Sequence, residues 1–387
     1  MIYLDNSASS LIKPKNVQRA VLSALNDFTA NPGRSGHKQS IKTALEVEKT
    51  RDLIANHVGT TADKIVFTLN CTDALNMAIL GTYKQGGHVV CTVNEHNSVR
   101  RPLEHLKKVD PEFSFSVAEQ SGPLGIVWKD IEKHLTDKTY LVIVNHISNV
   151  NGDIADIVDI GKHLKKRGIL FLVDGAQGGG HFLYRMQEMN INLLALAPHK
   201  GFYSPQGVGV LALNGDFDIN PIRFGGSGIN SLSADMPDEL PERLEAGTIN
   251  TPAILGFGEG VKFVEQNFSL IHTKIEDLTV YLHYELSKLG IHLYTKTENT
   301  CGVFAFNIPN LSSNDVSNYL DEKWNICTRS GLHCAPLKHK SLGTLPDGAV
   351  RVSISYFNTY QEIERLVLAL KTLLKHQTRL QQKKTSN

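Results

Sequence analysis

Short apolar runs rich in β-branched residues alternate with stretches of helical periodicity along the first two thirds of the chain. The runs are KIVFTL (64–69), HVVCTV (88–93), YLVIVNH (140–146), ILFLVDGA (169–176), LLALA (193–197) and GVGVLAL (207–213). Continuous apolar strands separated by helices are typical of a mostly parallel sheet with buried faces. The pattern therefore predicts an α/β domain.

The pattern changes after about Leu255. Two helical stretches, 253–274 and 277–289, lead into the strand-like segments CGVFAFNI (301–308) and AVRVSISYF (349–357), and a helix over 361–374 closes the chain. This order favours a smaller α+β unit. We therefore expect a large domain over residues 12–254, and a small domain made of the extended residues 1–11 together with 255–387.

The net charge and the cysteine content indicate which partners and which cellular compartment to expect. The 387 residues carry a formal net charge of +1, so nothing favours nucleic acid or an acidic membrane as a partner. The five cysteines are an odd number at irregular spacing, which indicates reduced thiols and a cytoplasmic protein. We see no signal peptide at the N-terminus and no apolar stretch long enough to span a membrane.

Several apolar runs end in polar residues, and ligands bind at the carboxyl ends of strands in open α/β sheets. Asp174 directly follows an apolar run, where a carboxylate needs a partner such as a protonated pyridine; a helix N-cap is the alternative. Lys200 also follows such a run, and a desolvated lysine is nucleophilic; a solvated loop lysine is the ordinary interpretation.

Three other segments carry candidate chemistry. The turn at Cys71 and Thr72 lies between a strand and a helix, which suits either an anion site or plain N-capping. Cys334 lies in RSGLHCAP, where Arg329 and His333 would favour its thiolate; the pair His333-Cys334 lacks the spacing of a zinc site, and we predict no metal. Arg351 interrupts a strand pattern and is either edge-exposed or a clamp for a carboxylate.

The ordered series of these segments resembles the class V aminotransferases of pyridoxal 5′-phosphate (PLP) fold type I, and within them the cysteine desulfurase and selenocysteine lyase family. The matching runs are YLDNSAS, NPGRSGH, FTLNCTDALN, NEHNS, HISNVNG, VDGAQ, PHKG, RLEAGT, RSGLHCAP and AVRVSISYFNT. The compact RSGLHCAP resembles the second group of desulfurases. The resemblance implies a mostly parallel, seven-stranded type of large domain, a small α+β domain and PLP as the cofactor.

The resemblance also implies roles for individual residues. Lys200 would form the Schiff base, and Cys334 would accept the sulfur as a persulfide. Cofactor contacts would come from Cys71 (through its backbone), Thr72, His96, Asn149, Asp174, Gln177, His199 and Thr248, and substrate contacts from Asn149, Arg351 and His37. Thr248 would reach the cofactor of the neighbouring subunit, which implies a homodimer. Asp174 would bind the pyridine nitrogen, and His96 would stack on the ring.

One departure from the family pattern affects cofactor binding. Members usually have Ser or Thr and then Gly before the His-Lys pair, whereas this chain has Ala197 and Pro198. Ala197 lacks a phosphate-binding hydroxyl, and Pro198 lacks a backbone donor. Losing one charge-assisted hydrogen bond weakens binding by about 1.5–3 kcal/mol if nothing compensates. The departure at Ala197 and Pro198 therefore bears on PLP retention and not on the role of Lys200.

The expected function is removal of sulfur from L-cysteine, giving L-alanine and a persulfide on Cys334 for a sulfur-acceptor protein. Three alternatives stay open: a selenocysteine lyase acting on L-selenocysteine, another class V aminotransferase or C–S lyase, and a non-catalytic family member. Iron–sulfur assembly, RNA thiolation and selenium delivery all use similar enzymes, and the sequence does not choose among them.

Overall fold

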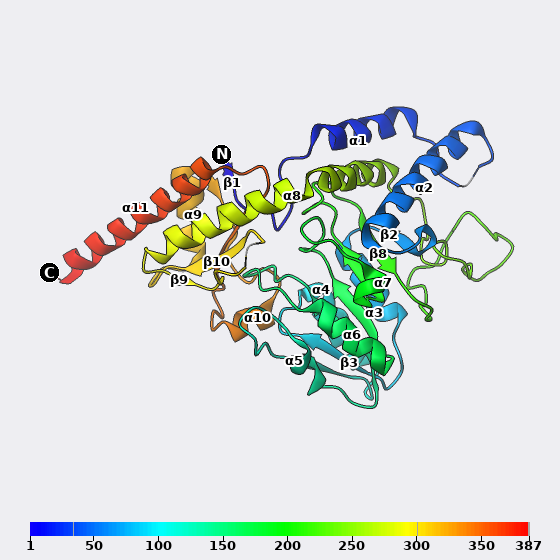
Figure 1. Cartoon of the computed structure of the whole chain (residues 1–387), viewed down its shortest axis with the longest axis horizontal. Coiled ribbons are helices and arrows are strands. Elements are labelled where there is room, and N and C mark those ends of the chain that lie inside the picture. Colours follow the sequence, from blue (N-terminus) through cyan, green and yellow to red (C-terminus); the bar gives the residue numbers. More distant parts are fainter. Residues whose placement is uncertain (34, 300, 386–387) are drawn as a thin grey trace. The chain divides into compact units, whose positions relative to one another are not determined.

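A seven-stranded sheet is the centre of the large unit, which comprises residues 12–147 and 154–268 (Figure 1). The structure is a computed structural model that describes residues 1–33, 35–299 and 301–385, with side chains as far as residue 378. The strands are β2 (Ile65–Thr68), β3 (His88–Thr92), β4 (Ser114–Ala118), β5 (Thr139–Asn145), β6 (Leu170–Asp174), β7 (Leu193–Leu196) and β8 (Gly209–Leu213). The fold class expected from the sequence is confirmed.

The sheet has the order β2-β8-β7-β6-β5-β3-β4. Neighbours from β7 through β4 pair in parallel, whereas β8 is antiparallel to both β7 and β2. All six predicted apolar runs form strands. β4 was missed because it lies at the edge of the sheet and is only partly buried, so its residues do not form a continuous apolar run.

Helices of the large unit follow the strands and supply the apolar side chains that pack on the sheet. Leu75 and Leu103, from two of these helices, share one buried core with Leu172 and Leu211 of the sheet. The helices are α1 (Lys15–Asp27), α2 (Lys38–Val58), η1 (Ala62–Lys64), α3 (Cys71–Gly81), α4 (Asn97–Val109), α5 (Trp128–Glu132), α6 (Ile157–Arg167) and α7 (Met186–Met189). The strand-to-helix connections therefore lie at the carboxyl ends of the parallel strands, where the candidate site is expected.

The small unit comprises residues 1–11, 148–153 and 269–387. Its elements are β1 (Ile2–Tyr3), β9 (His292–Leu293), β10 (Val303–Asn307), α9 (Ser313–Trp324), β11 (Ile326–Cys327), α10 (Pro336–Ser341), β12 (Val350–Ser353) and α11 (Tyr360–Thr385). β12, β10 and β9 form an antiparallel sheet, and the N-terminal β1 pairs in parallel with β11. Leu278, Phe304, Val352 and Leu366 lie in its buried core.

Two helices differ from the expectation. The stretches 253–274 and 277–289 form one helix, α8 (Thr251–Ser287), because the polar residues between them include no proline or glycine and Ile275 is buried within the helix. α11 extends to Thr385, well beyond the predicted end at residue 374. The predicted domain boundary at 254/255 falls inside α8 and stays a prediction. No helix in the described part of the chain combines the length and apolarity needed to cross a bilayer.

Candidate active site

Two neighbouring strands of the large unit end in polar side chains that contact each other. β5 and β6 run parallel, and their last residues, Asn145 and Asp174, are register partners. The side-chain amide of Asn145 donates to Oδ2 of Asp174 at 3.2 Å. The next strand in the sheet, β7, places Ala195 beside Asp174 and leads within five residues to Lys200. The sheet register therefore brings polar residues from separate sequence motifs to one edge.

Asp174 is a buried carboxylate, with 1% of its surface exposed. Its Oδ1 accepts from the backbone N–H of Ala176 at 2.9 Å, and its Oδ2 accepts from Asn145. Among the described residues, no cationic side chain forms an ion pair with it. A buried carboxylate without a counter-charge is unfavourable. This position therefore suits a cationic group that is not part of the chain, and the alternative of a helix N-cap does not apply, because Asp174 precedes no helix directly.

The turn before α3 has donors for an anion. The side chain of Asn70 caps the helix by accepting from the N–H of Asp73 at 3.0 Å. Within the described chain, the N–H groups of Cys71 and Thr72 have no acceptor, and the side chain of Thr72 is exposed. Free N–H groups at the start of a helix favour a bound phosphate. Plain N-capping is thus provided by Asn70, which leaves the two predicted residues available.

The thiol of Cys71 lies beside Asp174, with 3.9 Å between Sγ and Oδ1. Burial raises the pKa of this thiol well above its ordinary value, and the charge of Asp174 adds to the effect while Lys200 opposes it. Cys71 is therefore a neutral thiol that connects the turn before α3 to the end of β6. The sequence motif indicated a role only for its backbone.

Lys200 lies in a turn after β7, where its N–H donates to the carbonyl of Ala197 at 3.1 Å. Burial, together with the charges of Lys200 and Lys13, lowers the pKa of His199 to about 4. Lys13 Nζ donates to the carbonyl of His199 at 3.4 Å, and burial lowers the pKa of Lys13 to about 8. His199 is therefore neutral at neutral pH, and a second lysine that sequence reasoning missed lies beside the His-Lys pair.

The other predicted residues of the large unit lie on separate elements. His96 caps α4 by accepting from the N–H of Ser98 at 3.1 Å, and His37 caps α2 in the same way. Gln177 is buried three residues after Asp174. Thr248 is exposed, and its hydroxyl accepts from the side chain of Asn31 at 3.1 Å. The structure itself assigns no ligand contact to these four residues.

In the small unit, Asn149 and Arg351 contact each other. Arg351 is 1% exposed, so the edge-exposed alternative is wrong. Its guanidinium donates to the carbonyl of Asn149 at 3.0 Å and forms an ion pair with Asp5 at 2.5 Å. Arg351 Nε and Asn149 Oδ1 are buried and have no hydrogen-bond partner among the described residues. A buried donor and a buried acceptor are therefore open to a ligand.

Cys334 lies in the small unit in a turn with an uncommon backbone. Both His333 and Cys334 have positive φ angles, 49° and 58°. The side chain of Cys334 is half-buried, and Arg329 Nη2 lies 3.9 Å from its Sγ. His333 does not act as a second cation, because burial lowers its pKa to about 2. Of the two residues predicted to be cations beside this thiol, only Arg329 carries a charge. No metal-binding group of His, Cys, Asp or Glu occurs among the described residues.

Sequence reasoning missed the partners that hold these groups. Asn145 was visible as a polar residue at a strand end, but nothing indicated that it donates to Asp174. Asp5 pairs with Arg351 across 346 positions of sequence, and Lys13 reaches His199 across 186, so no local pattern could connect either pair.

A family model, similar sequences and a similar solved structure all indicate the same protein family. The model of the family "Aminotransferase class-V" matches residues 2–366. A probable cysteine desulfurase of Methanothermobacter thermautotrophicus is 32% identical over 94% of this chain and 92% of its own length, and one of Pyrococcus abyssi is 34% identical over 97% and 94%. The apo structure of a cysteine desulfurase from Thermococcus onnurineus has a TM-score of 0.89 and 31% identity, covering 97% of this chain and 95% of its own. The chain therefore belongs to the class-V aminotransferase family, whose members are PLP-dependent enzymes.

Proposed function

We propose that the chain is a PLP-dependent cysteine desulfurase with Cys334 as its sulfur acceptor. The observation that carries this proposal is the half-buried Cys334 thiol, which lies 3.9 Å from the guanidinium of Arg329. A neighbouring cation favours the thiolate, the form that attacks sulfur. Other class-V enzymes need a lysine and a ring acid but no thiol, so Cys334 is the residue that distinguishes a desulfurase.

The residues at the end of the large sheet fit PLP. Asp174 is a buried carboxylate with no cation partner among the described residues, and it would hold the protonated pyridine nitrogen. The N–H groups of Cys71 and Thr72 would bind the phosphate, aided by His199, while Lys200 would hold the aldehyde carbon. His96, Gln177 and Asn149 are proposed to contact the ring. When bound, PLP supplies an electron sink for the bonds at the substrate Cα.

Three residues of this chain would carry the reaction steps, and two more would contact the substrate. Arg351 binds the carboxylate of L-cysteine through its open Nε donor, with Asn149 and His37 as further proposed substrate contacts. Lys200 Nζ takes the proton from the substrate Cα and acts as the proton donor that completes the product. Cys334 Sγ then attacks the substrate sulfur: an S–S bond forms, the Cβ–S bond breaks, and its electron pair stays with the carbon skeleton.

The products balance the reactants. The substrate sulfur remains on Cys334 as a persulfide, and the carbon skeleton takes up a proton at Cβ and leaves as L-alanine. A thiol reductant or a sulfur-acceptor protein then takes the sulfur and returns Cys334 to its thiol form. All five cysteines are free, which supports a reducing compartment such as the cytoplasm.

We also propose a homodimer in which Thr248 reaches the cofactor of the partner subunit. Thr248 is exposed in the single chain, which supports a contact made by a second copy. Large apolar side chains are exposed on the same unit: Leu22, Leu25, Ile41, Leu45 and Phe224. Exposed apolar side chains of this kind are ones that a contact with a second copy would cover. Size-exclusion chromatography with light scattering tests the dimer, and loss of PLP from Thr248→Ala tests the contact.

The deciding experiment is incubation of the PLP-loaded protein with L-cysteine, followed by measurement of alanine and of persulfide on Cys334 by mass spectrometry. Cys334→Ser should form no alanine from L-cysteine and should keep the cofactor absorbance. Cys327→Ser is the matched control, since Cys327 is also half-buried and lies in the same unit.

The outcome separates the alternatives. Full desulfuration by Cys334→Ser would contradict the assignment of the nucleophile. If Cys334→Ser stays active on L-selenocysteine but loses its activity on L-cysteine, the chain would be a selenocysteine lyase. Amino transfer to a keto acid without persulfide would indicate another class-V enzyme, and protein that stays colourless with PLP would indicate a non-catalytic member.

A further inference from the structure

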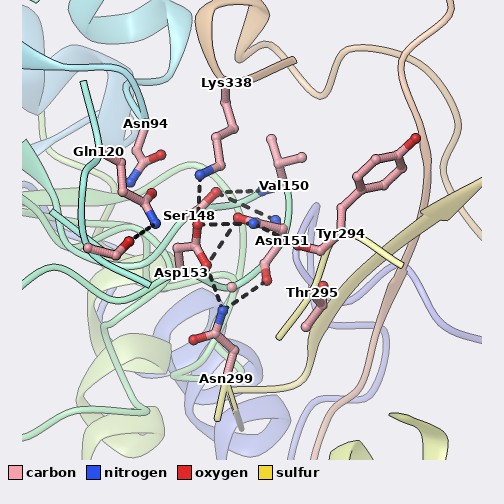
Figure 2. Close-up of polar contacts among 12 residues, drawn as sticks. Asn94, Gln120, Ser148, Val150, Asn151, Asp153, Tyr294, Thr295, Asn299 and Lys338 are labelled. Carbon is pink, nitrogen blue, oxygen red and sulfur yellow. Dashed lines mark hydrogen bonds and ion pairs between the residues drawn. The ribbon is translucent and has the colours of Figure 1, made fainter. Parts of the chain in front are cut away.

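A buried ion pair lies in the small unit, next in sequence to the cysteine turn. Lys338 Nζ is 2.7 Å from Oδ2 of Asp153, and both side chains are only 2% exposed. Figure 2 shows Asp153 at the centre of a polar cluster, where the side chains of Asn151 and Asn299 also donate to its carboxylate, at 3.0 and 2.8 Å. The four groups form a fixed, charge-assisted network.

The carboxyl group of Asp153 keeps its charge despite its burial. Burial alone would raise the pKa of Asp153, but the charge of Lys338 and the donated hydrogen bonds outweigh it and hold the pKa below its ordinary value. Buried ion pairs contribute little stability compared with well-packed apolar residues of the same size. Directional positioning is therefore a better account of the pair than stability.

The ion pair joins two segments that carry proposed site residues. Asp153 ends the segment 148–153, which contains Asn149, and the N–H of Ser148 donates to the carbonyl of Asp153 at 2.8 Å. Lys338 lies four residues after Cys334, within α10. A second link joins the same segments, because Asn149 Nδ2 donates to the carbonyl of His333 at 2.7 Å.

The turn at Cys334 needs such links to persist. Two consecutive non-glycine residues with positive φ are unfavourable, and a backbone of this kind persists only where its surroundings fix it. On one side, His333 contacts His339 at 3.1 Å, and His339 contacts the Thr344 hydroxyl at 2.7 Å. On the other side, the Lys338–Asp153 pair holds the first residues of α10. Without it, α10 and the turn have one anchor fewer to the Asn149 segment.

We propose that the Lys338–Asp153 ion pair positions Cys334, by fixing the turn in the conformation that keeps its Sγ beside Arg329. Lys338 and Asp153 are thus positioning residues for the sulfur transfer. The inference rests on the proposed function, because it takes Cys334 as the sulfur acceptor. Neither Lys338 nor Asp153 is proposed to contact the substrate or the cofactor.

The test uses the full-length, PLP-loaded protein and the variants Asp153→Asn and Lys338→Met. The matched control is Lys340→Met, which makes the same change on the same helix at an exposed position. The readouts are kcat and KM for L-cysteine, and the rate at which iodoacetamide alkylates Cys334 as a function of pH, followed by mass spectrometry. Alkylation reports the thiolate and its surroundings without requiring turnover.

Both variants should change the alkylation profile of Cys334, with a lower rate than the wild type at each pH, because the turn no longer holds Sγ in its place beside Arg329. They should lower kcat by about tenfold or more while KM changes little, since misplacing a reacting group affects the chemical step. The control should match the wild type in every readout. An unchanged alkylation profile in both variants would overturn the proposal, even if kcat fell.

A double variant, Asp153→Leu with Lys338→Met, keeps the test decisive if either single change prevents folding, because it leaves no buried charge without a partner. We expect it to fold with a melting temperature near that of the wild type but to keep the changed alkylation profile. Wild-type kcat and alkylation in the double variant would show that the pair serves stability alone, and would refute positioning. Failure of the wild type to form alanine would refute the desulfurase function, whereas the alkylation profiles would still decide on the positioning.

Discussion

Glu95 should make the stability of this protein fall as the pH rises. The residue follows β3 and is 1% exposed. Its Oε1 accepts from the Thr92 hydroxyl at 2.7 Å and from the N–H of Asn145 at 2.8 Å, whereas its Oε2 has no partner among the described residues. Burial raises the pKa of Glu95 to about 8; the bond from Thr92 opposes this rise, and the charge of Asp174 adds to it.

The direction of this pH dependence follows from the difference between the pKa of Glu95 in the folded protein and in the unfolded chain. The ordinary pKa of 4.5 applies in the unfolded chain, so between 4.5 and about 8 the folded state binds a proton that the unfolded state has released. The stabilising contribution of the protonated carboxyl is complete below 4.5 and is lost as the pH rises through 8. Between pH 5 and pH 8, this difference amounts to about 3–4 kcal/mol of unfolding free energy.

Glu95→Gln removes the titration while keeping the size of the side chain and an oxygen that can accept from Thr92 and Asn145. Urea denaturation of both proteins at pH 5, 6, 7 and 8 measures the effect. We expect the wild type to lose about 3–4 kcal/mol relative to the variant over this range. Glu119→Gln, at an exposed position, should run parallel to the wild type. A constant difference between the wild type and Glu95→Gln from pH 5 to pH 8 would refute the reasoning.

Further changes test the proposed site. Lys200→Ala should keep the far-ultraviolet circular dichroism of the wild type but show no visible absorbance of lysine-bound cofactor after incubation with PLP; a wild-type spectrum would contradict its role. Asp174→Asn should lower kcat by roughly 10²-fold, because an amide cannot keep the ring nitrogen protonated, and unchanged kcat would argue against the ring contact. Arg351→Met should raise the KM for L-cysteine, and urea denaturation should show a loss of about 2–3 kcal/mol, less than for a fully buried pair because Asp5 stays partly exposed. A KM equal to that of the wild type would remove Arg351 from the substrate site.

The large sheet was predictable because its central strands are buried on both faces, so each is a continuous apolar run in the sequence. β4 and the continuity of α8 were not predictable by the same rule. β4 lies at an edge, where partial exposure breaks the run, and the polar residues around Ile275 imitate a break between helices. In both cases, burial in the folded chain, rather than the local residue pattern, determines the element.

Candidate residues at strand ends were predictable for a related reason. Parallel strands align their carboxyl ends, so Asn145 and Asp174 were expected at the same edge of the sheet once both runs were identified as strands, whereas their direct pairing follows from the strand order in the folded sheet. The ion pairs of the small unit follow no such rule. Lys338 and Asp153 are 185 positions apart, and nothing in PLKHK indicates which of its lysines is buried. Only the folded small unit shows that Lys338 is enclosed and Lys340 is exposed.

Burial, more than residue type, determines which groups of the candidate site carry charge at neutral pH. His146 directly follows β5, and its N–H donates to the carbonyl of Asp174 at 3.1 Å. Burial lowers the pKa of His146 to about 3 and that of His199 to about 4, so both are neutral, and Glu95 is largely protonated. Asp174 lies at the same strand ends, where it is bonded to the neutral amide of Asn145 and where the charge of Lys200 acts on the neighbouring Cys71. One charge acts strongly in a low-dielectric setting, so the carboxyl group of Asp174 would favour a cationic ring nitrogen placed against it. We therefore expect the proposed contact of Asp174 with a protonated pyridine nitrogen to need no second charged acid.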